Sequence, residues 1–240
     1  GQLLVQELQS GKWPEVILSG CTSRSGSENV HNLYITEDAG ELFEHSDAII
    51  DFTLPEATLT HAKLAAQHKK ILVVGTTGMS KDQEQELQKA AEQTVIIYAA
   101  NMSLGVNLLM ALVEQAARAL DPEWDIEIFE SHHKLKIDAP SGTALALGNS
   151  AAEGRKKILP SPIPFDRNGA RKKGDIGFSV ARGGDVVGEH TVFFYGEGER
   201  LELTHRATNR ALFARGAIKA ALWAKGKKPG LYSMKDVLGL

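Results

Sequence analysis

The chain has 240 residues, of which 42% are hydrophobic and 24% charged, an ordinary composition for a globular protein with a full hydrophobic core. Its net charge of -3 gives no sign of a nucleic-acid partner. A single cysteine, Cys21, excludes an internal disulfide framework, and the sequence contains neither a visible signal peptide nor an apolar run of membrane-spanning length, so we expect a cytoplasmic protein without a membrane partner.

The first hundred residues alternate between helical patterns and short apolar runs. Residues 1–9 form an amphipathic pattern that predicts a helix. Pro55 favours the start of a helix that continues over residues 56–68, and Ser80 opens a capping box ahead of a helix that reaches about Glu92. Near-continuous, β-branched runs predict strands covered on both faces at residues 16–18, 48–52, 71–74 and 95–98. This alternation predicts an α/β fold with a doubly wound parallel sheet.

The pattern changes after about residue 105. A helix is predicted over residues 106–120, and strands are predicted at residues 125–131, 176–182 and 190–205. Within the last range, the Gly-Glu-Gly-Glu sequence at residues 196–199 separates two strand-like runs and predicts a hairpin. These strands favour a second, α+β domain with a mixed sheet. The predicted elements are completed by an exposed loop at residues 154–174 and a final helix at residues 210–225.

The most informative segment is the loop at residues 130–144, which reads ESHHKLKIDAPSGTA. It contains the adjacent His132 and His133, with Lys136 close behind. Ser141 is a natural N-cap for the helix after it, and the unpaired amides at a helix start bind anions. Together with Lys136, this segment offers two places for negative groups with imidazoles between them. That combination suits a small dicarboxylate and proton transfer.

The same residues allow two commonplace interpretations. A histidine pair is often part of a surface loop or a satisfied core, and a lone lysine is usually solvated, but their occurrence in one short loop favours function. Paired histidines also occur in zinc sites, which need further cysteine or histidine ligands at set spacings. Cys21 is distant in sequence and no His-Glu-x-x-His motif is present, so we expect no metal.

The loop closely resembles the signature of the dihydrodipicolinate reductase family of the diaminopimelate and lysine pathway. The resemblance covers nearly the whole chain, because it continues through residues 51–56, 75–78, 99–107, 188–190 and 230–238. It implies NAD(P)H-dependent reduction of 4-hydroxy-tetrahydrodipicolinate. It also implies a Rossmann-like dinucleotide-binding domain at residues 1–103 and 210–240, with a substrate-binding and oligomerisation domain inserted at residues 104–209.

A homotetramer is a further implication of the resemblance. The run Val192–Tyr195 carries apolar residues at successive positions, so both faces of that strand need covering. Packing within one chain explains the run nearly as well.

The glycine-rich phosphate loop of dinucleotide-binding proteins, Gly-x-Gly-x-x-Gly, is not in this sequence. Residues 1–4 resemble the residues that come directly after that loop in the family. We therefore expect Gly1 to stand at its last glycine, with the first strand and phosphate loop absent from this sequence. The stretch of residues 24–33 is also short for the family.

The remaining cofactor residues are identified by position and resemblance. Ser23 stands where an acidic residue would hold the ribose of NAD, and Arg24 next to it can accept a 2′-phosphate, so NADPH is expected to be tolerated or preferred over NADH. A polar loop with a solvated arginine fits these two residues equally well on sequence alone. After the predicted strand at residues 71–74, glycine lets the backbone approach a flat ring, and the hydroxyls of Thr76 and Thr77 can bond its carboxamide. A plain turn explains these residues as well. The resemblance implies that the nicotinamide is bordered by Gly75, Thr76, Thr77, Ala99, Ala100, Asn101 and Met102. It places Arg210 and Phe213 near the adenine.

Hydride delivery to an unsaturated cyclic imine requires a matching proton. His132 is a candidate acid because an imidazole titrates near working pH, and Lys136 can stabilise or protonate the developing negative charge. His133 and Lys136 would hold one carboxylate, and the amides of Gly142 and Thr143 the other. The sequence leaves open which of His132 and Lys136 donates the proton.

Three further alternatives also remain at this stage. Asp138 either orients Lys136 or caps the turn. The enzyme could be another NAD(P)-dependent dehydrogenase of a small dicarboxylate, such as an amino-acid dehydrogenase, although the His-His-x-x-Lys loop argues against that. A non-catalytic nucleotide-binding protein is supported only by the absence of the glycine loop.

Overall fold

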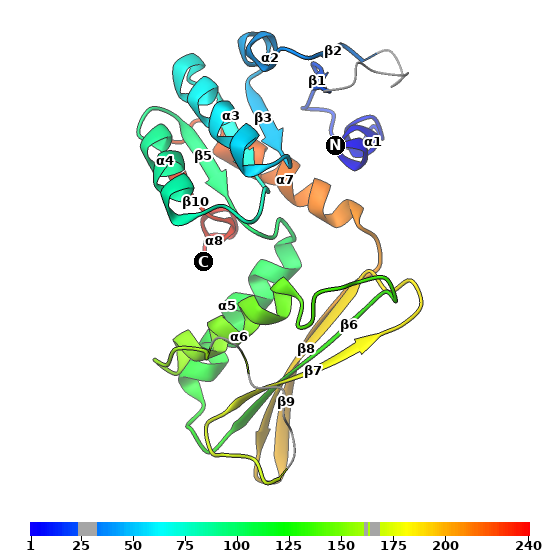
Figure 1. Ribbon diagram of the computed structural model, residues 1–240, viewed down its shortest axis with the longest axis vertical. Coiled ribbons are helices and arrows are strands. Elements are labelled where there is room, and N and C mark those ends of the chain that lie inside the picture. The colour runs from blue at the N-terminus through cyan, green and yellow to red at the C-terminus, as the bar shows by residue number, and fades with distance from the viewer. Residues whose placement is uncertain (24–32, 161–162, 164–168) are drawn as a thin grey trace. The chain divides into compact units, whose positions relative to one another are not determined.

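A computed structural model describes residues 1–23, 33–160, 163 and 169–240, which divide into two compact units (Figure 1). Unit 1 comprises Gly1–Ser103 and Ala211–Leu240, and unit 2 comprises Leu104–Arg210. The sequence placed the second boundary one residue earlier, since Arg210 belongs to unit 2. Among the described helices, none is both long and apolar enough to cross a lipid bilayer.

Unit 1 is built around parallel strands. Its helices are α1 (Gln2–Leu8), α2 (Ala39–His45), α3 (Pro55–His68), α4 (Lys81–Ala91), α7 (Ala211–Ala224) and α8 (Met234–Leu238). Its strands are β1 (Cys21–Thr22), β2 (Ile35–Thr36), β3 (Ala48–Asp51), β4 (Ile71–Val74), β5 (Val95–Tyr98) and β10 (Gly230–Tyr232). The main sheet has the order β10-β5-β4-β3, and β1 pairs separately with β2. Every one of these pairings is parallel, which confirms the predicted sheet.

Local sequence signals explain the ends of these elements. Pro55 occupies the first turn of α3, where its missing N–H is harmless. Ser80 and Gln83 form both bonds of the predicted capping box at the start of α4. Leu72 and Ile96 are fully buried in the core of the unit, as the apolar composition of the runs requires.

The predicted strand at residues 16–18 is wrong. No regular structure forms there, Ile17 is 90% exposed, and β1 begins only at Cys21. An extended segment becomes a strand only when a neighbour accepts its hydrogen bonds, and among the described residues β1 pairs with β2 alone.

Unit 2 is an α+β unit. It contains the helices α5 (Leu104–Ala119) and α6 (Gly142–Gly154) and the strands β6 (Asp125–His132), β7 (Ile176–Arg182), β8 (Gly188–Gly196) and β9 (Glu199–Ala207). The sheet order is β7-β6-β8-β9. The pair β6–β7 is parallel and the other two pairs are antiparallel. The predicted mixed sheet and the predicted hairpin between β8 and β9 are both confirmed.

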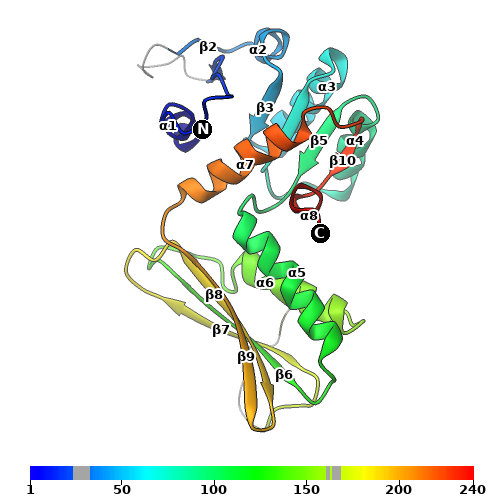
Figure 2. The ribbon, with the colours of Figure 1, turned by 180° about the vertical axis from the view of Figure 1, so that it is seen from behind.

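The two faces of this sheet differ. Helices α5 and α6 lie together along one side (Figures 1 and 2), and Ile126 and Ile128 of β6 pack with them in a closed core. Because successive strand residues point to opposite faces, Phe129 and Tyr195 lie on the other face, where they are 39% and 38% exposed. Phe193 stacks on Tyr195 with ring centroids 5.5 Å apart. This face therefore carries an aromatic group, Phe129, Phe193 and Tyr195, beside charged residues such as Glu127 and Arg171.

Helix α7 packs unusually close to the segment after β5. A Cβ on Gly216 would lie only 1.7 Å from the carbonyl oxygen of Met102, and Met102 is 1% exposed.

We expect Gly216→Ala to lower the free energy of unfolding by about 1–3 kcal/mol, since overpacking displaces backbone. Thermal unfolding would measure this as a lower Tm. Lys219→Ala, at an exposed position of the same helix, is the control and should change stability by less than about 0.5 kcal/mol. An unchanged Tm for Gly216→Ala would contradict the close packing.

Candidate active site

The loop between β6 and α6 brings the predicted site residues of unit 2 together. Strand β6 ends at His132. The His132 carbonyl accepts a hydrogen bond from the Gly183 amide at 2.9 Å. The Lys134 amide donates to the Gly184 carbonyl at 3.2 Å, and the Lys136 amide donates to the His133 carbonyl at 3.1 Å. The loop is thus anchored to the connection between β7 and β8.

Ser141 caps α6 as predicted. Its hydroxyl oxygen accepts a hydrogen bond from the Ala144 amide at 3.1 Å, and its backbone is extended rather than helical. The amides of Gly142 and Thr143 belong to the first turn of α6. Gly142 is exposed. A helix start favours nearby negative charge, and the assignment of a carboxylate to these amides stays a prediction.

Glu130 joins the two ends of this loop. One carboxylate oxygen accepts hydrogen bonds from the Ser141 amide at 3.0 Å and from Nη2 of Arg182 at 2.8 Å. The other accepts from Nη1 of Arg182 at 3.0 Å and bonds to Nδ1 of His132. Burial raises the pKa of the Glu130 carboxyl, but the bonds from Arg182, Ser141 and His132 outweigh it, so the pKa lies below its ordinary value. Glu130 is therefore an ionised carboxylate, and the residue is 0% exposed.

Two imidazoles lie edge to face beside this carboxylate. The rings of His132 and His190 have centroids 5.1 Å apart and planes 76° apart. Nε2 of His190 lies 3.1 Å from the Ser141 hydroxyl, while its Nδ1 is buried without a hydrogen-bond partner. Burial lowers the pKa of His190 to about 4. The pKa of His132 is also lowered, because burial outweighs the opposite effect of Glu130, so both rings are neutral at physiological pH.

Lys136 lies nearer the surface than the histidine pair. Its ammonium group is 2.8 Å from the Asp138 carboxylate, and the two side chains are 21% and 60% exposed. Lys136 lowers the pKa of Asp138 through this hydrogen bond. Of the two roles considered for Asp138, the structure therefore shows a contact with Lys136. An ion pair this exposed contributes at most about 1 kcal/mol, so Lys136 is readily redirected to another anion.

Glu130, His132 and His190 together resemble a metal-ligand set, because their ligand atoms lie within 4.8 Å of one another. However, both oxygens of Glu130 already accept hydrogen bonds from the Arg182 guanidinium. A guanidinium at that position would repel a metal cation. The donor set therefore fits a charge-balanced hydrogen-bond network, and the expectation of no metal stays a prediction.

The predicted nicotinamide residues of unit 1 gather at one edge of its sheet. Gly75, Thr76 and Thr77 come after β4, and residues 99–102 come after β5 (Figure 1). The Ala99 amide donates to the Val74 carbonyl at 3.1 Å, so the two segments are neighbours. The hydroxyl of Thr76 is buried and accepts a bond from Thr58 at 2.9 Å. Thr77 is exposed. The bond from either threonine hydroxyl to the carboxamide stays a prediction.

The other segment, after β5, is held by its own side chain, since Asn101 accepts a bond from the Ser103 amide at 2.8 Å. Ala100 is exposed, Asn101 is half-buried and Met102 is buried. Ala100 and Asn101 thus remain accessible at the edge of the sheet.

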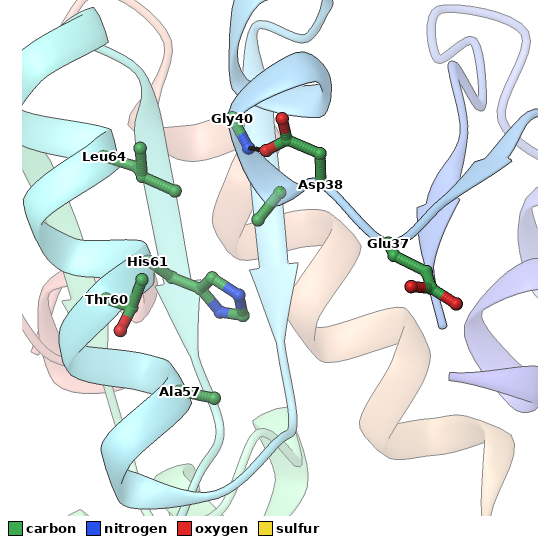
Figure 3. A pocket seen from close by; sticks show the side chains of 8 residues that line it. Glu37, Asp38, Gly40, Ala57, Thr60, His61 and Leu64 are labelled. Atoms are coloured by element: carbon green, nitrogen blue, oxygen red, sulfur yellow. Dashed lines mark hydrogen bonds between the residues drawn. The ribbon is translucent and has the colours of Figure 1, made fainter. Parts of the chain in front are cut away.

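Further predicted cofactor residues are less informative. Ser23 comes directly after β1, and its amide donates to the Thr36 carbonyl at 3.2 Å, whereas Arg24 lies outside the described residues. Arg210 is exposed at the end of unit 2, and Phe213 is half-buried on α7 in unit 1. Figure 3 shows an open pocket beside α2 and α3 that contains none of the predicted site residues; it is lined by Glu37, Asp38, Ala39, Gly40, Ala57, Thr60, His61 and Leu64.

Sequence reasoning missed four residues of the sites. Glu130, Arg182 and His190 complete the loop network, and Phe52 lies across Gly75, where an added Cβ would be 2.2 Å from its ring. One signal was available for Glu130: it occupies a core-facing position two residues after Ile128, and a charge there requires a partner. Nothing in the sequence identified Arg182 as that partner, because 52 residues separate them.

The chain is similar to known proteins over both of its halves. Residues 1–102 match the model for the N-terminus of dihydrodipicolinate reductase, and residues 105–238 match the model for its C-terminus. The 4-hydroxy-tetrahydrodipicolinate reductase of Ruegeria sp. (strain TM1040) is 50% identical over 100% of this chain and 94% of that protein. The same enzyme of Parvibaculum lavamentivorans is 56% identical over 87% of this chain and 78% of its own length.

Solved structures agree with these matches. The dipicolinate-bound dihydrodipicolinate reductase of Paenisporosarcina sp. TG-14 superposes with a TM-score of 0.79 at 26% identity, over 97% of this chain and 92% of that one. A DAP dehydrogenase of C. glutamicum shares the fold alone, with a TM-score of 0.53 at 12% identity over 98% of this chain and 90% of that one. With both halves matched and relatives half identical over its whole length, the chain belongs to the dihydrodipicolinate reductase family.

Proposed function

We propose that the chain catalyses the NAD(P)H-dependent reduction of 4-hydroxy-tetrahydrodipicolinate to tetrahydrodipicolinate in diaminopimelate and lysine biosynthesis. The observation that carries the proposal is the loop from Glu130 to Thr143, which combines paired imidazoles, a partly exposed ammonium group and a capped helix start. The curated relatives, about 50% identical, bear the name of this activity.

The substrate is a dicarboxylate, and the loop offers two anion sites for it. We assign one carboxylate to the amides of Gly142 and Thr143 at the start of α6, where the helix dipole favours negative charge. The other carboxylate goes to Lys136, exchanging with Asp138, and to His133. The solved relative that carries dipicolinate, a planar dicarboxylate, supports this class of ligand.

A reduced nicotinamide supplies the hydride when it is bound. In unit 1, Gly75, Thr77 and residues 99–102 would hold its ring at the carboxyl edge of the sheet, the place where ligands bind in this fold. In unit 2, we assign proton transfer to His132, whose Nδ1 is bonded to Glu130. Its Nε2 takes up a proton from solvent, and the imidazolium, stabilised by the Glu130 carboxylate, gives that proton to the substrate. We assign charge stabilisation to Lys136. Lys136 suits that role because its surface partner, Asp138, is easily replaced.

The chain is further proposed to act as a homotetramer in the cytoplasm. The aromatic group on the face without helices, Phe129, Phe193 and Tyr195, supports association, since Phe129 and Tyr195 are 39% and 38% exposed and Phe193 stacks on Tyr195. Cys21 is unpaired, in keeping with a reducing compartment.

Replacing His132 with Gln, or Lys136 with Ala, should lower kcat by roughly 10²–10⁴-fold, because each removes acid catalysis or charge stabilisation. NADPH binding, measured by fluorescence titration, should hardly change. A matched control is Lys134→Ala, which removes an exposed ammonium group from the same loop. Equal losses of NADPH affinity in both site variants would show that the site is misplaced.

Stability should fall below pH 6.5 because of His190. Its folded pKa of about 4 lies below the ordinary 6.5, so between these values the unfolded chain binds more protons. As the pH falls from 6.5 towards 4, the free energy of unfolding should therefore decrease, by up to about 1.4 kcal/mol per pH unit. Thermal unfolding of the protein and of His190→Asn from pH 7.5 to 4.5 tests this, and the variant should show the flatter dependence. Parallel curves would contradict the buried, neutral His190.

Cofactor choice should depend on Ser23 and Arg24. Arg24→Ala should raise KM for NADPH roughly tenfold to hundredfold, since a hydrogen bond to a charged group contributes about 1.5–3 kcal/mol, with a smaller change for NADH. Ser23→Glu should shift selectivity towards NADH by repelling the 2′-phosphate. Steady-state kinetics with both cofactors provide the measurement. An equal rise of both KM values for Arg24→Ala would rule out contact with the 2′-phosphate.

The mass in solution should be about four times the 26.0 kDa of one chain, as measured by light scattering at micromolar concentration. Phe129→Glu should shift the protein to smaller species, because it places a charge in the aromatic group. Ile158→Glu is the control, at a position that is 93% exposed and outside the sheet. A monomeric mass for the unmodified chain would end the tetramer proposal.

A further inference from the structure

Glu130 contacts both the proposed carboxylate-binding part and the proposed proton-transfer part of the site. Its carboxylate is 0% exposed. Through one oxygen it holds the Ser141 amide, at the start of the helix assigned to a substrate carboxylate. Through the other it holds Nδ1 of His132, the residue assigned to proton transfer. A single side chain therefore connects carboxylate binding to proton transfer.

The fold fixes this arrangement from two strands. Glu130 and His132 are two residues apart on β6 and so point to the same face of the sheet. Arg182, the last residue of β7, is opposite His132 in the parallel register. Its guanidinium binds both oxygens of Glu130 and also donates to the Asp138 carbonyl at 2.7 Å. The carboxylate is thus held in one orientation.

We propose that Glu130 is the positioning residue of the active site, which sets the tautomer of His132 and, independently, the position of the Ser141 amide at the carboxylate site. The proposal rests on the proposed function, because the roles of His132 and of the α6 start come from it.

The tautomer is dictated by the chemistry of the carboxylate. An ionised carboxylate only accepts hydrogen bonds, so the neutral His132 ring carries its proton on Nδ1 and its lone pair on Nε2. Nε2 faces Gly188, where an added Cβ would lie 2.9 Å away. Glycine at this position leaves space beside the nitrogen that takes up a proton from solvent and gives it to the substrate. The Glu130 carboxylate balances the charge of the imidazolium formed in between.

The substitution Glu130→Gln should change the tautomer of His132 while keeping the contact with the Ser141 amide. The Ser141 amide and Nη2 of Arg182 both donate to one oxygen, so the amide oxygen of Gln takes that side. Its NH₂ group then faces Nδ1 of His132 and donates to it, while Nη1 of Arg182 loses its acceptor. Nδ1 must become the acceptor, and the ring proton moves to Nε2. To give up that proton the neutral ring would have to become an imidazolate, and no carboxylate is left to stabilise an imidazolium.

The experiment compares Glu130→Gln with the unmodified chain by three measurements. Two-bond ¹H–¹⁵N correlation spectra, with the His132 signals assigned from His132→Gln, should show the proton on Nδ1 in the unmodified chain and on Nε2 in the variant. Reduction of 4-hydroxy-tetrahydrodipicolinate should lose roughly 10²–10⁴-fold in kcat. The affinity for pyridine-2,6-dicarboxylate, measured by calorimetry, should stay within about threefold, because the Ser141 contact is kept.

A matched control lies on the same strand. Glu127 is also paired with an arginine, Arg171, but points to the opposite face of the sheet. Glu127→Gln should leave kcat and the His132 tautomer unchanged. The double variant Glu130→Gln/Arg182→Met removes the buried charge along with its partner, and it should retain the loss of kcat.

Several outcomes would overturn the proposal. An unchanged His132 tautomer in Glu130→Gln would do so, as would kcat restored in the double variant, which would reduce Glu130 to a counterion for Arg182. Failure of the proposed function is distinguishable, because the unmodified chain would then not reduce the substrate. In that case the spectra and the pyridine-2,6-dicarboxylate titration still decide the role of Glu130.

Discussion

The bidentate ion pair between Glu130 and Arg182 is the contact on which the rest of the site depends. A buried carboxylate is tolerated only when its charge is balanced and its lone pairs accept hydrogen bonds. Arg182 supplies the charge, and the Ser141 amide and His132 supply further donors. Because Arg182 also holds the Asp138 carbonyl, one pair fixes the end of β6, the end of β7 and the start of α6.

Strand β6 serves the core and the site with one repeating pattern. Its inward positions begin with Ile126 and Ile128, which are fully buried against α5 and α6, and continue with Glu130 and His132. The same alternation therefore changes from apolar to polar along the strand. The apolar half fixes the register, because a slip of one residue would expose the core side chains. The register in turn places the polar half under the loop, so the precision of the site derives from packing.

Predictions from local signals agreed with the structure. Ser141 and Ser80 cap their helices, and the strands at residues 71–74, 95–98 and 176–182 have the predicted bounds. Such features depend on propensities within a few residues. The signals that failed were non-local. Residues 16–18 have the composition of a strand but no neighbour to pair with in the described part of the chain, and the Glu130–Arg182 pair joins two strands through their register. Residue composition alone predicts neither the missing pairing partner of residues 16–18 nor the Glu130–Arg182 pair.

The charges of the loop are divided between a buried and an exposed set. Arg182 is committed to Glu130, and His190 is neutral because burial holds its pKa at about 4. Among these groups, Lys136 is the cation whose partner, Asp138, is 60% exposed and weakly held. Under the proposed function, a dicarboxylate entering the loop would displace Asp138 from Lys136 without disturbing the buried network. The rigid part of the loop would keep His132 and the start of α6 in place, while the exposed part would exchange one carboxylate for another.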